Sequence, residues 1–219
     1  MLIGTDETLV LIGDSITDAG RARPVGSGPD GGLGGGYAAY VNAVLSAVHP
    51  DRRIKVLNTV ISGNTVRDLE SRWTTDVLDL KPDWLSIMIG TNDVWRQFDA
   101  VDRPEIHVLP SEFEERLGRL VKQTLPKLKG LVLMTPFLIE PDLTDPMRAM
   151  MDRYGKMVAN IAGANGAILV DTQAAYDNVL LSSKPSALSG DRVHPNQVGH
   201  MVLAGALLSG LKLEWASAE

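Results

Sequence analysis

Residues Thr8–Ile12 read TLVLI, and Gly13, Asp14 and Ser15 follow them directly. A short apolar run that ends at a glycine indicates a strand buried on both faces, because a strand with one solvated face alternates apolar and polar residues. Ligands of parallel sheets bind beyond the carboxyl ends of the strands. The stretch therefore predicts a buried parallel strand, with Asp14 and Ser15 placed where a functional site would lie.

Similar apolar runs recur about every 30 residues, and segments with helical periodicity separate them. The further predicted strands are Ile54–Val60, Trp84–Ile89, Leu131–Met134 and Ala167–Val170. The predicted helices are Tyr37–Val48, one with Val66, Leu69, Trp73, Val77 and Leu80 on a single face, one with the stripe Phe113, Leu117, Leu120 and Val121, Pro146–Ile161, and Asn196–Leu208. Ser111 and Glu114 have the spacing of a capping box and predict the start of the third helix.

This alternation of strands and helices predicts an α/β protein, in which a parallel sheet is covered on both faces. We expect a three-layer α/β/α sandwich with a five-stranded parallel sheet. The 219 residues, without an evident linker or internal repeat, predict one domain spanning residues 1–219.

The composition excludes several classes of function. The chain has no cysteine, so disulfides and cysteine-based metal sites are excluded. Its net charge of −6 and the lack of a Lys/Arg cluster argue against a nucleic-acid partner. No apolar window is long enough to span a membrane, and the N-terminus lacks the features of a signal peptide. We therefore expect a cytoplasmic protein without membrane association.

A second polar motif suggests what Ser15 could do. Asp191 precedes His194 by three residues, a spacing that lets a carboxylate accept a hydrogen bond from one imidazole nitrogen. The other nitrogen is then free to take a proton from a serine hydroxyl, which is a weak nucleophile without a base. Each residue alone has a structural alternative, since Ser15 could cap a turn and His194 could be a surface histidine. The remaining histidines, His49, His107 and His200, are expected to be structural or solvated.

Two further strand ends supply candidate donors for an oxyanion. Gly63 follows the second predicted strand, where its backbone N–H could face a ligand closely at the start of a helix. Asn92 follows the third strand and offers a side-chain amide. Taken singly, Gly63 could serve only to start a helix and Asn92 only to form a turn. Together with Ser15, they place polar groups at the ends of three separate strands.

Four ordered blocks of the chain resemble the signature of the SGNH (GDSL-type) hydrolase superfamily. They are GDSI, the glycine of ISGN, GTND and DRVHP, and they extend from Gly13 to His194. Additional stretches, among them GRARP, MTPF, DPMR and DTQAA, are similar to bacterial intracellular acetylxylan esterases. The resemblance implies a flavodoxin-like fold, with Ser15 as nucleophile, His194 as general base and Asp191 as the residue that orients it. It also implies an oxyanion hole made by the N–H groups of Ser15 and Gly63 and the side chain of Asn92.

The expected function is removal of acetyl groups from carbohydrate esters such as acetylated xylo-oligosaccharides, without a cofactor or metal. Two alternatives stay open: an esterase, lipase or thioesterase for another acyl group, and a non-catalytic flavodoxin-like binding module. Gly190 departs from the acetylxylan esterases, several of which carry a tryptophan there, and this puts the sugar or acyl pocket in doubt. Trp95 is a candidate for contact with the sugar. The resemblance also implies a homo-oligomer, for which Asp99–Pro110 and the tail with Trp215 could supply contacts.

The remaining motifs predict no cofactor. Gly26–Gly31 fits G-x-G-x-x-G, but it does not lie directly between a strand and a helix and contains Pro29, so a flexible loop is favoured over a dinucleotide site. Ser15 is followed by Thr17 where the nucleophile elbow of an α/β-hydrolase has its second glycine. Met147, Met150, Met151 and Met157 fall on one predicted helix and are expected to pack in the core.

Overall fold

The computed structural model describes residues 1–214, and a five-stranded parallel sheet lies at its centre. The strands are β1 (Thr8–Gly13), β2 (Lys55–Asn58), β3 (Trp84–Met88), β4 (Gly130–Met134) and β5 (Ile168–Val170). Their order across the sheet is β2-β1-β3-β4-β5, which is the flavodoxin-like arrangement. The predicted α/β class, the five parallel strands and the flavodoxin-like topology are confirmed.

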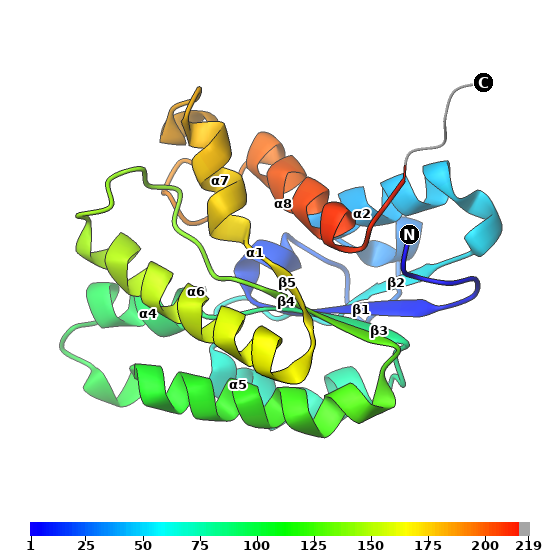
Figure 1. Cartoon of the computed structure of the whole chain (residues 1–219), viewed down its shortest axis with the longest axis horizontal. Coiled ribbons are helices and arrows are strands. Elements are labelled where there is room, and N and C mark those ends of the chain that lie inside the picture. Colours follow the sequence, from blue (N-terminus) through cyan, green and yellow to red (C-terminus); the bar gives the residue numbers. More distant parts are fainter. Residues whose placement is uncertain (215–219) are drawn as a thin grey trace.

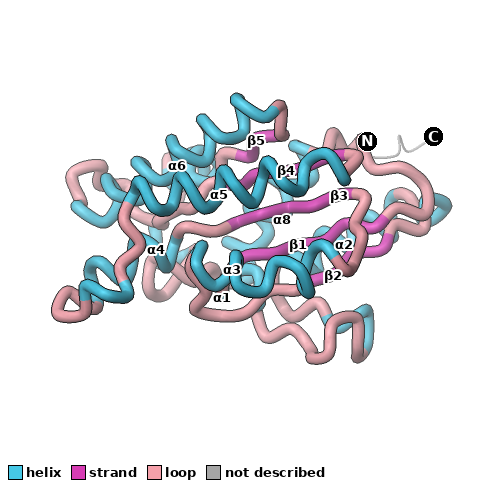
Figure 2. Tube along the Cα trace, turned by 90° about the horizontal axis from the view of Figure 1, so that it is seen from below, coloured by secondary structure: helices cyan, strands magenta, loops and turns pink. Residues whose placement is uncertain are grey.

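Helices cover both faces of the sheet (Figure 1). The helices are α1 (Ser15–Asp18), α2 (Tyr37–Val48), α3 (Val66–Trp73), α4 (Thr91–Asp99), α5 (Pro110–Thr124), α6 (Pro146–Asn165), α7 (Thr172–Leu180) and α8 (Gln197–Gly210). In Figure 1, α2, α7 and α8 lie above the sheet, and α4, α5 and α6 lie below it. The tube in Figure 2 shows α3 and α5 crossing the sheet on the same side. This is the expected three-layer sandwich.

The apolar strands explain why two helical layers are needed. In β1, Val10 and Ile12 pack into the core with α3, α5 and α6, whereas Leu9 and Leu11 pack into the core with α2 and α8. All four side chains are fully buried. Because alternate residues of a strand point to opposite faces, an uninterrupted apolar run can be buried only when both faces are covered.

The predicted start of α5 was wrong. Ser111 lies inside this helix, and its N-cap is Leu109. Pro110 occupies the first helical position, where its fixed φ favours helix initiation and its missing N–H is not needed. The helix therefore begins two residues earlier than a capping box with Ser111 as N-cap would place it.

Three helices were not predicted: α1, α4 and α7. All three begin within three residues after the end of a strand, at the carboxyl edge of the sheet, and they are short or polar. The predicted helix beginning near Val66 ends at Trp73 and continues as a π-turn over Thr74–Leu78. The four methionines of α6 all pack in or against the core, as expected.

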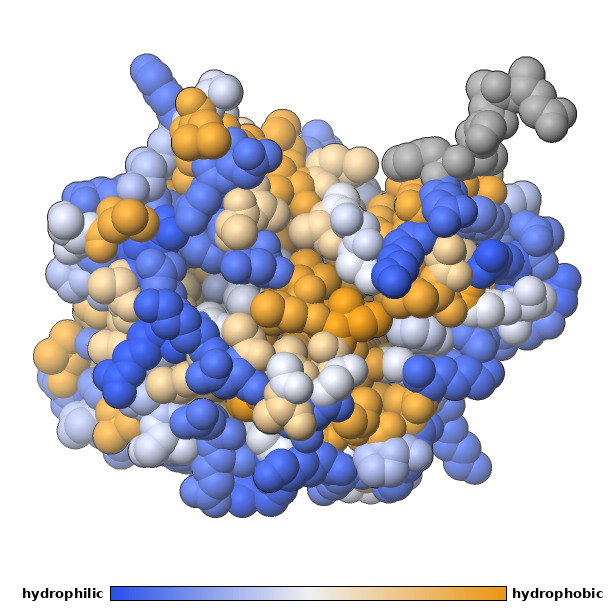
Figure 3. All heavy atoms as spheres, in the orientation of Figure 1, coloured by the Kyte–Doolittle hydropathy of each residue, from blue (hydrophilic) through white to orange (hydrophobic). Residues whose placement is uncertain are grey.

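The exposed surface over β5 is apolar in part. Figure 3 shows hydrophobic side chains gathered in the middle of the face that is turned towards the viewer, where β5 lies in Figure 1. Leu169 of this edge strand is 40% exposed. No helix between residues 1 and 214 combines the length and apolarity needed to cross a bilayer. Trp215, a predicted oligomer contact, lies outside the described residues.

Candidate active site

Ser15 is the first residue of α1, directly behind β1. Asp14 caps the helix by accepting a hydrogen bond from the backbone N–H of Ile16 over 3.1 Å. Gly13 has no room for a side chain, because a Cβ there would lie 2.2 Å from the backbone oxygen of Met88 on β3. The close approach of the two strands therefore requires glycine, and the turn behind it projects Ser15 at the carboxyl edge of the sheet.

The structure brings Ser15, His194 and Asp191 together in one hydrogen-bonded chain. The Ser15 Oγ lies 2.9 Å from His194 Nε2, and His194 Nδ1 lies 2.7 Å from Asp191 Oδ2. Because a carboxylate can only accept, Nδ1 carries the proton and Nε2 is left to accept from the serine hydroxyl. This tautomer is the one in which a histidine can act as a base towards serine.

Asp191 is held in its ionised form by several donors. Burial opposes the charge, but hydrogen bonds from the His194 ring and from the backbone N–H groups of His194 and Val193 outweigh it. The Ser189 hydroxyl donates a further bond over 3.0 Å. Together these donors hold the pKa of Asp191 well below its usual range. The carboxylate can therefore orient His194 and stabilise its protonated form.

Arg192 anchors the turn between Asp191 and His194, a role that the sequence analysis missed. Its φ of +69° is left-handed, a conformation that a residue with a side chain rarely adopts. Its Nη1 donates to Glu140 over 2.7 Å and to Asp145 over 3.0 Å, and its carbonyl oxygen accepts from the backbone N–H of Ile139. The segment between β4 and α6 thus holds the turn that carries the acid and the base.

Gly63 lies in the loop between β2 and α3. Its φ of +82° favours glycine, and a Cβ there would meet no atom within 4 Å, so the backbone conformation and not space requires glycine. The neighbouring Ser62 is tied to Asp18 at the end of α1. Its backbone N–H and its hydroxyl both donate to Asp18 Oδ2, over 3.1 and 3.0 Å. Asp18 therefore connects the helix that begins at Ser15 with the loop that carries Gly63.

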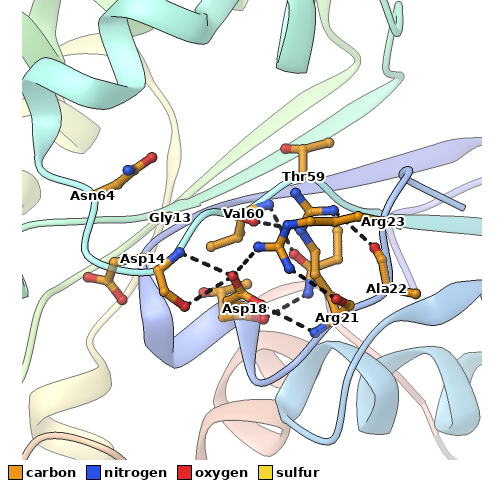
Figure 4. A network of polar contacts seen from close by, with 12 residues as sticks. Gly13, Asp14, Asp18, Arg21, Ala22, Arg23, Thr59, Val60 and Asn64 are labelled. Atoms are coloured by element: carbon orange, nitrogen blue, oxygen red, sulfur yellow. Dashed lines mark hydrogen bonds and ion pairs between the residues drawn. The ribbon is translucent and has the colours of Figure 1, made fainter.

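A network of charged side chains surrounds Asp18 (Figure 4). Arg23 Nη2 donates to Asp18 Oδ2 over 2.6 Å, and Arg21 Nε donates to the backbone oxygen of Val60 in the same loop as Gly63. Burial opposes the charge of Asp18, but the hydrogen bonds from Arg23 and Ser62 outweigh it and lower the pKa. Asp18 is 3% exposed, so its charge is fully committed to these partners.

Arg72 of α3 holds the other end of this loop. Its Nη1 donates to the backbone oxygen of Thr59 over 2.7 Å, and its Nε donates to the Asn64 side chain over 2.7 Å. Its Nη2 also lies 3.3 Å from the backbone oxygen of Gly13. The ends of β1 and β2 are thereby linked through one guanidinium.

Asn92 lies next to the Gly63 loop. Its Nδ2 donates to the backbone oxygen of Asn64 over 3.0 Å, and its Oδ1 accepts from Arg96 over 3.3 Å. The side chain is 2% exposed and is the second residue of α4. One of its two N–H bonds holds Asn64 and fixes the amide in place, and the other has no acceptor within residues 1–214.

Two buried carboxyl groups, Asp14 and Asp93, lie beneath these residues. Desolvation raises the pKa of each to about 7, against the opposing hydrogen bonds from Ile16 to Asp14 and from Val66 to Asp93. Within residues 1–214, the Oδ2 atoms of both side chains are buried without a hydrogen-bond partner. Asp93 carries no sign of burial in the sequence, because an acidic residue in a predicted turn is expected to be exposed.

Trp95 contacts His194 directly. The two rings meet edge to face, with centroids 5.7 Å apart. The guanidinium of Arg96 lies over the same indole, 5.1 Å from its centroid. Trp95 is therefore held beside the imidazole, and its contact with a sugar stays a prediction.

The other three histidines lie in separate environments. His200 is buried on α8 and its Nδ1 accepts from the backbone N–H of Tyr37. Burial lowers its pKa to about 4, and the charge of His194 adds to this effect. His107 bonds to the backbone oxygen of Ala100, and His49 bonds to that of Glu214. Among residues 1–214, no group of three His, Asp or Glu side chains gathers in the way a metal site requires.

A flavodoxin-like sheet with a hydrogen-bonded serine, histidine and aspartate at its carboxyl edge defines a class, the serine hydrolases of SGNH type. The model of the GDSL-like lipase/acylhydrolase family matches residues 11–202. The chain therefore belongs to this family and is a carboxylic ester hydrolase.

Individual relatives are similar over the whole chain. An acetylxylan esterase from Geobacillus stearothermophilus is 55% identical over 215 residues, which cover 98% of each chain. The crystal structure of an acetylxylan esterase from that organism superimposes with a TM-score of 0.97 at 54% identity and covers 100% of both chains. A structure described as an alpha/beta hydrolase enzyme, from the metagenome of Lake Arreo in Spain, gives a TM-score of 0.95 at 48% identity and covers 97% of this chain and 98% of its own.

Proposed function

We propose that this protein removes acetyl groups from carbohydrate esters, with acetylated xylo-oligosaccharides as the substrate class. The observation that carries the proposal is the hydrogen-bonded chain from Ser15 through His194 to Asp191. The similarity to the Geobacillus acetylxylan esterase over nearly the full length supports the choice of substrate. Solved structures of catalytic mutants of that enzyme are described as S15A, D191A and H194A, numbers that coincide with the three residues here.

The first half of the reaction forms an acetyl-enzyme. The Ser15 hydroxyl gives its proton to His194 Nε2 as its oxygen bonds to the acetyl carbonyl carbon, and the carbonyl oxygen becomes an oxyanion. The N–H groups of Ser15 and Gly63 and the Asn92 amide donate to this oxyanion. The bond from the carbonyl carbon to the sugar oxygen then breaks, and His194 returns its proton to that oxygen. Asp191 stabilises the imidazolium in between.

The second half regenerates the enzyme. Water gives a proton to His194 and its oxygen attacks the acetyl carbon, so that a second oxyanion forms in the same place. The bond to Ser15 Oγ breaks, the serine takes the proton back, and acetic acid leaves and ionises to acetate in solution. No cofactor enters this sequence, because every proton and bonding pair is supplied by the three side chains and water.

Gly190 stands beside Asp191 at a position where the Geobacillus enzyme, by its numbering, has a tryptophan. The residue is exposed, and a Cβ there would meet no atom within 4 Å. One solved mutant of the Geobacillus enzyme replaces a tryptophan numbered 190 by isoleucine. We infer that the space beside Asp191 is more open in this chain than it is with a tryptophan at position 190.

A substrate panel tests the proposed function. Acetate release should be measured from acetylated xylo-oligosaccharides and from nitrophenyl esters of increasing acyl length, with wild type and Ser15→Ala. We expect acetyl esters to react fastest and Ser15→Ala to release no acetate above background. Faster turnover of long acyl chains would favour the lipase or thioesterase alternative, and binding of sugars without turnover would favour a binding module.

The location in the cytoplasm and the homo-oligomer stay predictions. Sedimentation velocity of the purified chain, with and without residues 212–219, tests the oligomer and the contribution of the tail that contains Trp215. A single monomeric species in both proteins would contradict the prediction.

A further inference from the structure

A cavity of about 290 Å³ lies beside the candidate active site. Trp95 and Phe98 of α4 line it, together with Asp99 at the end of that helix, Asp145 and Met147 at the start of α6, and Arg192. Two of these residues reach the reacting groups. The Trp95 ring meets the His194 ring, and Arg192 lies in the turn between Asp191 and His194. One end of the cavity wall is thus shared with the site.

The chemistry of the proposed reaction decides which part of the substrate lies here. His194 Nε2 must give its proton to the oxygen of the leaving alcohol, so the sugar begins at hydrogen-bond distance from that atom. The Trp95 indole packs against the same imidazole. A sugar ring bonded to that oxygen, or the ring linked to it, can therefore extend along Trp95 into the cavity.

The side chains of the wall suit a neutral sugar ring. Trp95 and Phe98 offer apolar ring surface, and Phe98 is 37% exposed in spite of its size. Arg192 uses its Nη1 for Glu140 and Asp145, while its Nε and Nη2 have no protein partner within residues 1–214. The free N–H groups of this guanidinium can donate to sugar hydroxyl groups. Asp99 Oδ2 accepts from Arg96 Nη1, which leaves Oδ1 of the same carboxylate as the acceptor for a hydroxyl group. Small-molecule sites combine apolar walls with a few placed polar groups in this way.

The size of the cavity limits its occupant. Ligand pockets usually measure roughly 300–1,000 Å³, so 290 Å³ lies at the lower limit and suits one ring but not a chain of rings. The negative net charge of the chain, −6, also disfavours a polyanionic occupant.

We propose that this cavity is the leaving-group subsite, which binds one neutral pyranose ring of the sugar alcohol while its acetyl group lies at Ser15. The inference rests on the proposed function, since it concerns the same reaction. It goes beyond that function because it gives Phe98 and Asp99 a role in selecting the alcohol part of the ester, although they touch neither Ser15 nor His194.

The test compares two esters with the same acyl group and different alcohols, acetylated xylobiose and ethyl acetate. Phe98→Ala removes one apolar wall, and Asp99→Asn replaces the charged acceptor. We expect each variant to lower the ratio of kcat/KM for acetylated xylobiose to kcat/KM for ethyl acetate by about ten-fold, the lower end of what a lost pocket contact is worth. Val101→Ala is the matched control, because Val101 is 70% exposed near the same helix end and does not line the cavity.

Inhibition by the product gives a second readout that does not require turnover of a sugar ester. Xylobiose should inhibit ethyl acetate hydrolysis competitively, and its inhibition constant should rise about ten-fold in Phe98→Ala but not in Val101→Ala.

The outcomes separate the two proposals. Wild type that hydrolyses ethyl acetate but no acetylated saccharide would overturn the proposed function, and the subsite with it. The subsite alone would be overturned if wild type deacetylates acetylated xylobiose but Phe98→Ala and Asp99→Asn leave two quantities unchanged. These are the ratio of kcat/KM between the two esters and the inhibition constant of xylobiose. An equal loss on both esters would also overturn the subsite, because the cavity would then support the catalytic groups and not the sugar.

Discussion

The hydroxyl oxygen of Ser15 lies 2.9 Å from Nε2 of His194, although 179 positions separate the two residues in the chain. Ser15 follows the second strand of the sheet from one edge, and His194 lies in a turn that returns to the same end of the sheet after β5. The turn is fixed there by the two carboxylates that bind Arg192. The pair can act only as a unit, because the serine needs the base and the base needs the orientation that Asp191 provides.

This dependence predicts that losses at the two residues do not add. We expect Ser15→Ala, His194→Ala and the double variant to lose nearly the same factor in kcat, because removing either partner already abolishes the nucleophile. Measurement of kcat with nitrophenyl acetate for the three variants tests this expectation. A double variant whose kcat falls below that of wild type by the product of the two single effects would show that the residues act independently.

The position of Asn92 beside the Gly63 loop predicts a specific loss in the rate of the chemical step. Asn92→Ala should lower kcat ~100–1000-fold, the usual effect of removing one oxyanion donor, with little change in KM. The far-ultraviolet spectrum and melting temperature should be recorded too, because the amide also holds the backbone of Asn64. Asn178→Ala on the exposed face of α7 serves as control. Near-normal turnover would remove Asn92 from the mechanism.

Asp18 is expected to position the loop that carries Gly63, a proposed oxyanion donor, without touching the substrate. Asp18→Asn keeps the size of the side chain but removes the charge that Arg23 and Ser62 share, so the loop should loosen. We expect kcat to fall ~10-fold or more, since a donor displaced by a fraction of an ångström loses much of its effect. KM should change little. Asp6→Asn, which breaks an exposed ion pair with Arg53, is the matched control. A rise in KM at unchanged kcat would indicate instead that Asp18 supports substrate binding.

The buried Asp93 predicts a pH dependence of stability. Burial raises its pKa to about 7, so between about pH 4 and pH 7 the folded protein keeps a proton that the unfolded chain releases. The free energy of unfolding must therefore fall as the pH rises through this window. The contribution of the neutral acid is complete below about pH 4 and is lost as the pH passes 7.

Asp93→Asn tests this pH dependence, because an amide keeps an acceptor for the Val66 N–H and stays neutral at every pH. We expect the variant to resemble wild type in stability near pH 4.5 and to exceed it at pH 8, by as much as about 4 kcal/mol for a shift of three pKa units. Urea unfolding at the two pH values measures the difference. An equal effect of the substitution at both pH values would contradict the raised pKa.

Predictions from the sequence succeeded where burial has a local signature. The five strands were recognised from apolar runs, and the stripe of Phe113, Leu117, Leu120 and Val121 is buried on α5 as its spacing predicted. Prediction failed for the short helices α1, α4 and α7. These helices contain too few residues for a helical periodicity to be recognised in the sequence. They form because the strands before them end at a fixed place. The start of α5 was misplaced because Pro110, and not Ser111, sets the first turn.

The sequence by itself determined the alternation of strands and helices, the polar residues that follow each strand, and the short-range pairing of Asp191 with His194. Only the tertiary structure decided which distant side chains meet: Asp18 with Ser62 across 44 positions, Arg192 with Glu140 across 52, and Trp95 with the His194 ring. The reason is physical. The periodicity of a sequence indicates which face of one helix or strand is buried. These contacts depend instead on how far separate loops extend past the sheet and on which charged side chains they bury as pairs.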